Sequence, residues 1–273
     1  MKKTLFGSAM VMTLLLMASA AFATNTLDAD TIVRKANHAA LYLGETCKGR
    51  VTLTITDSQE RVRKRELNIL RMDMPGGDQA QKYMTYFRSP ADVRKMSFLV
   101  HKTVEPGQDD ARWLYMPGLD LVKRIAAGDK RTSFAGSDFL YEDISGRNMS
   151  EDVHERQNDV DGYLVIRNTP KVPSSVEFSH YLAYIDCETF VPMKLEYFKG
   201  DTLYRVMEVL NVEKIPSGDG GKSFPTVTES RFKNLETGSS TVMSFTNIRY
   251  DIPLKENIFG ERYLRRPPRE VMR

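Results

Sequence analysis

The stretch Val51-Thr52-Leu53-Thr54-Ile55-Thr56 alternates apolar and hydroxyl side chains with a period of two. Successive side chains of a β-strand point to opposite faces of a sheet, and β-branched residues favour extended backbone. The stretch therefore predicts a strand with one buried face. Similar runs recur between turn signals such as Pro75-Gly76-Gly77 and Lys199-Gly200-Asp201. About 11 strands at this spacing, in an α+β chain that is mainly antiparallel β, favour a meander over a sheet that alternates with helices.

The N-terminal 23 residues have the pattern of an export signal. A basic start is followed by an apolar run from Leu5 to Ala20 and by the small-x-small triplet Ala21-Phe22-Ala23. The apolar run is short for a membrane span, so we predict cleavage after Ala23 and not a membrane anchor. Residues 1–23 are then a signal peptide, and residues 24–273 are expected to form a single periplasmic domain.

Composition narrows the classes of partner. The chain has 39 Lys and Arg residues against 36 Asp and Glu residues, so no nucleic-acid partner is expected. The arginine-rich stretch 262–273 is either solvated or docks on an acidic partner or an anionic lipid surface. Cys47 and Cys187 form either a disulfide, which an oxidising compartment permits, or two small buried thiols. No spacing of His or Cys predicts a metal site, and no cofactor motif is present.

One long helix is predicted over residues 28–43. Asp28 or Asp30 can cap its start, and apolar residues at helical spacing give it one buried face. Several later strands, including those at 179–186 and 202–213, are apolar on both faces. Such strands need a cover on each side, from another sheet, a helix or a bound apolar ligand. A half-closed barrel around an apolar cavity and a dry sandwich both meet this need.

The segment from Ala126 to Asn148 is a long insertion between strands, and its apolar residues suit a lid over a cavity mouth. It also contains an acidic cluster of Asp138, Glu142 and Asp143. Paired carboxylates can perform acid–base chemistry, but capping and loop-fixing hydrogen bonds are the better explanation for this cluster. Because no nucleophile motif or metal motif accompanies it, we expect the protein not to be an enzyme.

Two sequence blocks carry a resemblance to a known family. Residues 112–125 (RWLYMPGLDLVKRI) and 134–144 (FAGSDFLYEDI) are similar to the outer membrane lipoprotein-sorting proteins, which are LolA-like periplasmic carriers. The resemblance extends over essentially the whole mature chain. It implies a half-open antiparallel β-barrel with an N-terminal helix, a helical or loop lid, and an apolar cavity that holds acyl chains.

The resemblance also implies a function. It implies a carrier or chaperone that binds lipids or acylated lipoproteins and moves them toward the outer membrane. Many such proteins accompany inner-membrane exporters of the resistance-nodulation-division class, which are therefore candidate partners. The alternative function is a non-catalytic structural subunit of a membrane export complex, with a dry core.

The candidate cavity wall consists of large apolar residues from the strands and the insertion, including methionines that repack around varied ligands. These candidates are Met96, Phe98, Trp113, Tyr115, Phe139, Met193, Leu195 and Met207. Ordinary core packing is the alternative explanation for each of them taken alone.

Overall fold

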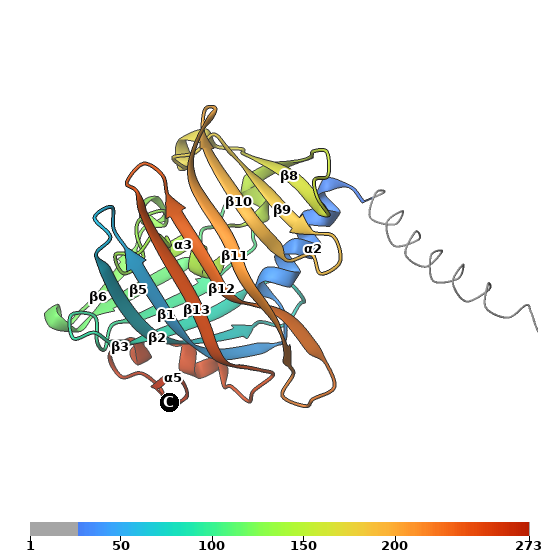
Figure 1. The fold of residues 1–273 in the computed structure, drawn as a ribbon. Helices are drawn as coiled ribbons and strands as arrows, with labels where there is room; N and C mark the ends of the chain where they lie inside the picture. Colours follow the sequence, from blue (N-terminus) through green and yellow to red (C-terminus); the bar gives the residue numbers. More distant parts are fainter. Residues whose placement is uncertain (1–26, 273) are drawn as a thin grey trace, which may run out of the picture.

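The computed structural model describes residues 27–272, and in these residues a large curved sheet dominates the fold (Figure 1). The expected signal peptide lies outside the described residues. Within residues 27–272, every helix is too short or too polar to cross a membrane.

The strands form one antiparallel sheet of 13 strands in the order β6-β5-β4-β3-β2-β1-β13-β12-β11-β10-β9-β8-β7. Their bounds are β1 (Thr46–Thr56), β2 (Val62–Asp73), β3 (Gln81–Ser89), β4 (Ser97–Lys102), β5 (Ala111–Met116), β6 (Leu121–Ile125), β7 (Asp152–Arg156), β8 (Tyr163–Pro170), β9 (His180–Asp186), β10 (Pro192–Lys199), β11 (Thr202–Pro216), β12 (Ser223–Asn234) and β13 (Ser239–Tyr250). Strands β1 and β13 pair at the centre. Strands β6 and β7 are the two edges, so the described sheet is unclosed.

The prediction of about 11 strands is therefore corrected to 13. Strand β7 gave no signal because its sequence, Asp-Val-His-Glu-Arg, has almost no apolar alternation. As an edge strand it pairs only with β8, and edge strands commonly carry charged side chains. The strand predicted from the opening alternation is confirmed, since Val51, Leu53 and Ile55 of β1 are buried.

Few helices accompany the sheet. They are α2 (Ala29–Leu41), α3 (Tyr141–Ser145), α4 (Arg262–Arg265) and α5 (Arg269–Met272), with short 3-10 turns η1 (Pro117–Leu119), η2 (Ala127–Asp129), η3 (Met149–Glu151), η4 (Pro173–Ser175) and η5 (Glu256–Phe259). The start of α2 is confirmed, because Asp28 is the N-cap and accepts a hydrogen bond from the Thr31 amide at 2.6 Å. Its buried Ile32 packs with Ile166 of β8 and Ile185 of β9.

Alternate residues of β2 to β5 enter two separate cores on opposite faces of the sheet. Phe98 belongs to the core on the concave face, whereas the next residue, Leu99, belongs to a second core on the convex face. The C-terminal segment completes the convex core, where Phe259, Leu264 and Val271 are at most 1% exposed. The chain therefore covers the convex face with its own C-terminus, and α5 lies close to β2 and β3 there (Figure 1).

Residues 126–151, here called the connection, lead from β6 to β7. Because these two strands are opposite edges of the sheet, the connection spans its open side. Phe134 and Phe139 of the connection are buried in the concave core, and the Phe134 ring lies 5.4 Å from that of Phe98. The concave face is thus covered partly by α2 and partly by the connection.

Candidate functional site

A pocket of about 390 Å³ lies on the concave side of the sheet. Helix α2 contributes Val33 and Leu41 to its wall, and the connection contributes Phe139 and Ile144. Strands β1 to β3 and β7 to β13 form the remaining wall, which is mostly apolar. Pockets of roughly 300–1,000 Å³ with apolar walls are the usual size and character of small-molecule sites.

Three side chains on neighbouring strands form the central part of this wall. Leu195 of β10 is the register partner of Met207 of β11, and Met207 is the register partner of Phe232 of β12. Directly opposed residues in a sheet point to the same face, so these side chains lie together in the pocket. The ring of Phe139 meets that of Phe232 edge-on, with centroids 4.8 Å apart. The connection is thereby packed directly on the wall.

Phe245 of β13 closes another part of the wall, and its position depends on a glycine. The Phe245 ring lies against Gly49 of β1 so closely that a Cβ atom at Gly49 would overlap it. The β1–β13 register also shifts between Lys48 and Arg50. A bulge with glycine in the strand is the usual way in which a sheet admits such close contact.

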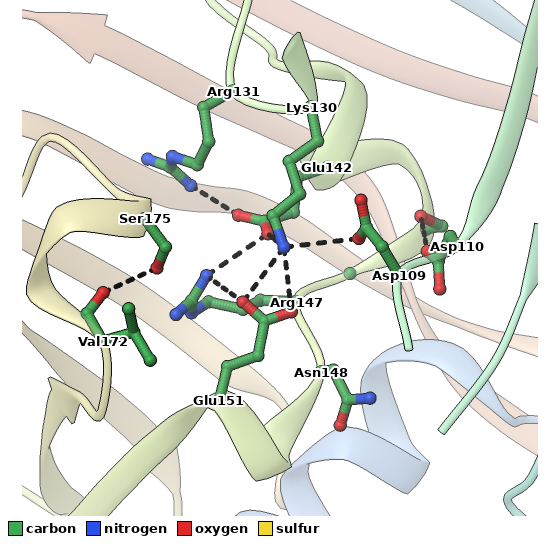
Figure 2. A network of polar contacts seen from close by, with 12 residues as sticks. Asp109, Asp110, Lys130, Arg131, Glu142, Arg147, Asn148, Glu151, Val172 and Ser175 are labelled. Atoms are coloured by element: carbon green, nitrogen blue, oxygen red, sulfur yellow. Dashed lines mark hydrogen bonds and ion pairs between the residues drawn. The ribbon is translucent and has the colours of Figure 1, made fainter. Parts of the chain in front are cut away.

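A buried ionic network holds the connection in place (Figure 2). The Glu142 side chain of α3 is only 2% exposed and lies within 2.7 Å of Arg131, 3.3 Å of Arg147 and 3.4 Å of Lys130. Burial alone would raise the pKa of Glu142, but these three cations hold that pKa below its usual value. Glu142 is therefore an ionised carboxylate at neutral pH.

Contacts of the connection reach strand β4 on one side of the opening and the edge strand β7 on the other. On the β4 side, the ammonium of Lys102 donates to the backbone carbonyls of Ser145 at 2.6 Å and Gly146 at 2.9 Å, and burial lowers its pKa. On the β7 side, Arg147 donates two hydrogen bonds of 2.9 Å to Asp152. Hydrogen bonds from Lys102 and ion pairs of Arg147 therefore attach the connection to the β4 and β7 sides of the described sheet, which are not joined to each other by strand pairing.

The other two carboxylates of the acidic cluster also hold the connection. Asp143 forms an ion pair with the buried Arg205 of β11, whose guanidinium also lies 3.7 Å from the centre of the Phe232 ring. Asp138 accepts hydrogen bonds from Ser239 at 2.5 Å and Thr241 at 2.6 Å, both on β13. The cluster makes the loop-fixing hydrogen bonds that the sequence favoured. The absence of enzymatic activity stays a prediction.

A second, more polar recess of about 410 Å³ adjoins the pocket at the start of α2. Val33, Met149 and His154 line both hollows. Arg34 and Lys171 also line the recess, where Arg34 donates to the Thr31 hydroxyl and Lys171 to the Ser150 carbonyl. The carboxylates of Asp30 and Asp152 line the same recess, so its wall carries charges of both signs.

Several solved structures share this fold. A protein domain from Vibrio parahaemolyticus, described as an outer membrane lipoprotein-sorting protein domain, is 24% identical with a TM-score of 0.75, covering 86% of this chain and 97% of that one. A DUF1329 family protein from Desulfovibrio piger is 27% identical with a TM-score of 0.76, covering 86% and 96%. A LolA superfamily protein from Nitrosomonas europaea is 17% identical with a TM-score of 0.62, covering 87% and 100%.

A protein-family model described as "-like: Uncharacterized protein" matches residues 79–266, which is more than half of the chain. The chain belongs to this family, and its fold is LolA-like. The predicted resemblance to the lipoprotein-sorting proteins is confirmed at this level. No curated protein matches the sequence.

Three of the eight candidate wall residues lie in the wall of the pocket. They are Phe139, Leu195 and Met207. Two more belong to the concave core without lining the pocket: Phe98 is fully buried beneath Phe134 and Tyr141, and Met96 is half-buried beside it. The role of any of these residues in binding stays a prediction.

The other three candidates lie away from the pocket wall. Trp113 and Tyr115 of β5 are on the convex face, where they pack with the C-terminal segment. Their placement in the cavity is wrong because Leu114, between them, takes the concave face. Met193 of β10 falls at a register shift between Pro192 and Lys194, and such a bulge removes a residue from the strict alternation.

Two strands that the sequence predicts contain further residues of the pocket wall. Val51 of β1 and the alternating Tyr181, Ala183 and Ile185 of β9 line the pocket, and both strands were predicted from their patterns. Alternation shows which residues share a face, but it does not show which face encloses a hollow. Val209, Val227 and Met243 were missed for the same reason.

The structure excludes one cysteine alternative and bears out the other in part, since Cys47 is buried and Cys187 is half-buried. Cys47 and Cys187 are free thiols, so the disulfide is not formed. Cys47 is buried, and burial raises its pKa to about 12, which keeps the thiol protonated. Within residues 27–272, His, Cys, Asp and Glu side chains form no group of three or more suited to hold a metal ion.

Proposed function

We propose that this protein is a periplasmic carrier that binds the acyl chain of a lipid or lipoprotein in its concave pocket. The observation that carries this proposal is the apolar pocket of about 390 Å³, enclosed by α2, the connection and the sheet. Transfer of a hydrocarbon from water into an apolar site yields about 0.8 kcal/mol per CH₂ group. A long acyl chain therefore has a large driving force for binding without any covalent chemistry.

The adjoining recess supports an amphiphilic cargo. Its wall carries Arg34 and Lys171, and it shares Val33, Met149 and His154 with the apolar pocket. A molecule whose tail fills the pocket would place its polar group in this recess. An anionic head group there would gain charge-assisted hydrogen bonds from the two cations.

The connection acts as the lid in this proposal. It is held by side-chain contacts and not by strand pairing, so it can move without disrupting the ladder of the sheet. Release of cargo would require the ion pair between Arg205 and Asp143 to break while the strands stay paired. Transport toward the outer membrane, with an exporter of the resistance-nodulation-division class as the donor or partner, is the accompanying proposal.

Mass spectrometry of lipid extracted from the purified native protein tests this function. We expect a long-chain lipid or acylated peptide at close to one molecule per protein. The variant Val209→Phe, which places a ring in the pocket, should carry much less. An absence of lipid from both proteins, together with no uptake of fatty-acid probes, would instead favour the structural subunit with a dry core.

A further inference from the structure

The β5–β6 hairpin ends in two exposed leucines. Leu119 is 72% exposed, the largest value for any big apolar side chain among residues 27–272, and Leu121 is 45% exposed. Single exposed apolar residues are common on protein surfaces. Here two exposed leucines lie one residue apart at the tip of a hairpin, because Leu119 ends η1 and Leu121 begins the edge strand β6.

Basic side chains surround this tip. Lys123 and Arg124 follow on the edge strand β6, and the Arg124 guanidinium lies 6.0 Å from the centre of the Trp113 ring. Helix α4 brings Arg265 to the tip, where it binds the side chain and the carbonyl of Asp120 at 3.1 Å each. The arginine-rich C-terminus, which the sequence left without a partner, therefore meets the hairpin here.

The acidic residues near the tip do not cancel this charge. Asp120 is already bound to Arg265, and Asp129 lies 3.8 Å from Lys123. Helix α4, which carries Arg265, also begins with Arg262 and is followed by Arg266, and Glu261 precedes it. Lys123, Arg124 and Arg265 therefore stand against two carboxylates in the contacts next to the hairpin tip.

We propose that this tip, formed by Leu119, Leu121 and the surrounding cations, docks on a bilayer surface that contains anionic lipid. The leucines would enter the boundary between head groups and acyl chains, while lysine and arginine bind anionic head groups. An acidic protein would satisfy the cations but would not require two protruding leucines. The pairing of both features favours a membrane.

The position of the tip fits this role. It lies beside β6, at one edge of the sheet, whereas α2 lies at the other side of the molecule (Figure 1). The polar recess is lined by residues at the start of α2. A protein docked through the tip would keep the recess free for exchange of a ligand. The proposal itself depends on the exposed tip and not on what the pocket binds.

Flotation of the full purified protein with lipid vesicles tests the proposal. We expect at least about tenfold stronger binding to vesicles of phosphatidylcholine with 30% phosphatidylglycerol than to phosphatidylcholine alone, and weaker binding at high salt. The double variant Leu119→Ser with Leu121→Ser should lose about tenfold or more of this binding. Lys123→Glu should weaken binding to the anionic vesicles only.

A matched control is Leu235→Ser, since Leu235 is 50% exposed but lies in the β12–β13 turn, away from the tip. This variant should bind vesicles like the unaltered protein. All variants change exposed residues, and uptake of a fluorescent fatty acid by the pocket reports separately on folding and on the proposed carrier function. Lack of vesicle binding, or equal binding by the double leucine variant, overturns the proposal even if fatty-acid uptake is normal.

Discussion

The sheet carries apolar side chains on both of its faces, and the two faces are covered in different ways. On the convex face, the apolar side of β2 to β5 is covered by the C-terminal segment, and Leu99, Phe259 and Leu264 are at most 1% exposed. On the concave face, α2 and the connection cover the sheet but leave a pocket of about 390 Å³. Strands that are apolar on both sides therefore do not by themselves indicate a ligand site. The cover decides whether a face becomes core or cavity.

The largest predicted change is the loss of stability on truncating a side chain in the filled convex core, compared with the same change in the pocket wall. Phe259→Ala should lower the free energy of unfolding by about 3–5 kcal/mol, because it creates a cavity in a close-packed core. Leu195→Ala should cost only about 1–2 kcal/mol, since this side chain is partly exposed and already borders empty space. Urea denaturation measures both values. Equal losses would contradict the distinction between the two faces.

The next largest loss of stability is expected when an ion pair that holds the connection to the sheet is removed. Arg205→Met should cost about 3 kcal/mol, because it leaves the Asp143 carboxylate buried without its cation. Removal of both charges, in Arg205→Met with Asp143→Leu, should recover part of this loss.

The exposed pair between Lys199 and Glu236 is the matched control. Lys199→Met should change the unfolding free energy by less than about 1 kcal/mol. If Arg205→Met were equally mild, ionic contacts would not be what holds the connection to the wall.

The third prediction adds volume to each face. Val209→Phe should change stability by less than about 1 kcal/mol, because the pocket can accept the added ring. Leu99→Phe should cost about 1–3 kcal/mol, since this residue is fully buried in the convex core and a larger side chain must displace its neighbours. Thermal denaturation of the two variants compares them directly. A large loss for Val209→Phe would mean that the concave side is already filled.

The sequence predicted local features well. It predicted poorly which face of the sheet a given side chain occupies. The strand at 51–56 and the cap at Asp28 depend on neighbouring residues, so alternation and capping preferences were sufficient. Trp113 and Tyr115 were placed on the wrong face because their cover comes from residues 258–271, far along the chain. The bulge at Met193 and the unpatterned strand β7 likewise depend on contacts that no local pattern encodes.

The acidic cluster illustrates the same limit. Its carboxylates were correctly expected to make structural hydrogen bonds, because Asp and Glu readily bind nearby donors. Their partners were not predictable, since Arg205 lies 62 residues from Asp143 in sequence. The pocket was a hypothesis that depended on how α2 and the connection sit on the sheet, and alternation does not encode this arrangement.

The last predicted effect concerns acid, and solvent weakens it because the Glu177 side chain is 36% exposed. Burial alone would raise the pKa of Glu177, but hydrogen bonds and charge from Arg131 lower that pKa from 4.5 to about 2. A lowered folded-state pKa stabilises the protein above the unfolded value and ceases to do so as pH falls. The free energy of unfolding should therefore decline between about pH 5 and pH 2, and Glu177→Gln should decline less. Denaturation at several pH values measures this, and an unchanged slope in the variant would contradict it.

Titration of the delipidated protein with a fluorescent 16-carbon fatty acid tests the central claim most directly. The account predicts saturable binding of one probe per protein, competition by unlabelled fatty acid, and at least about tenfold weaker binding by Val209→Phe. The variant Leu235→Ser should bind the probe like the unaltered protein. No saturable binding, or binding that Val209→Phe leaves unchanged, would contradict the claim that the concave pocket holds a hydrocarbon chain.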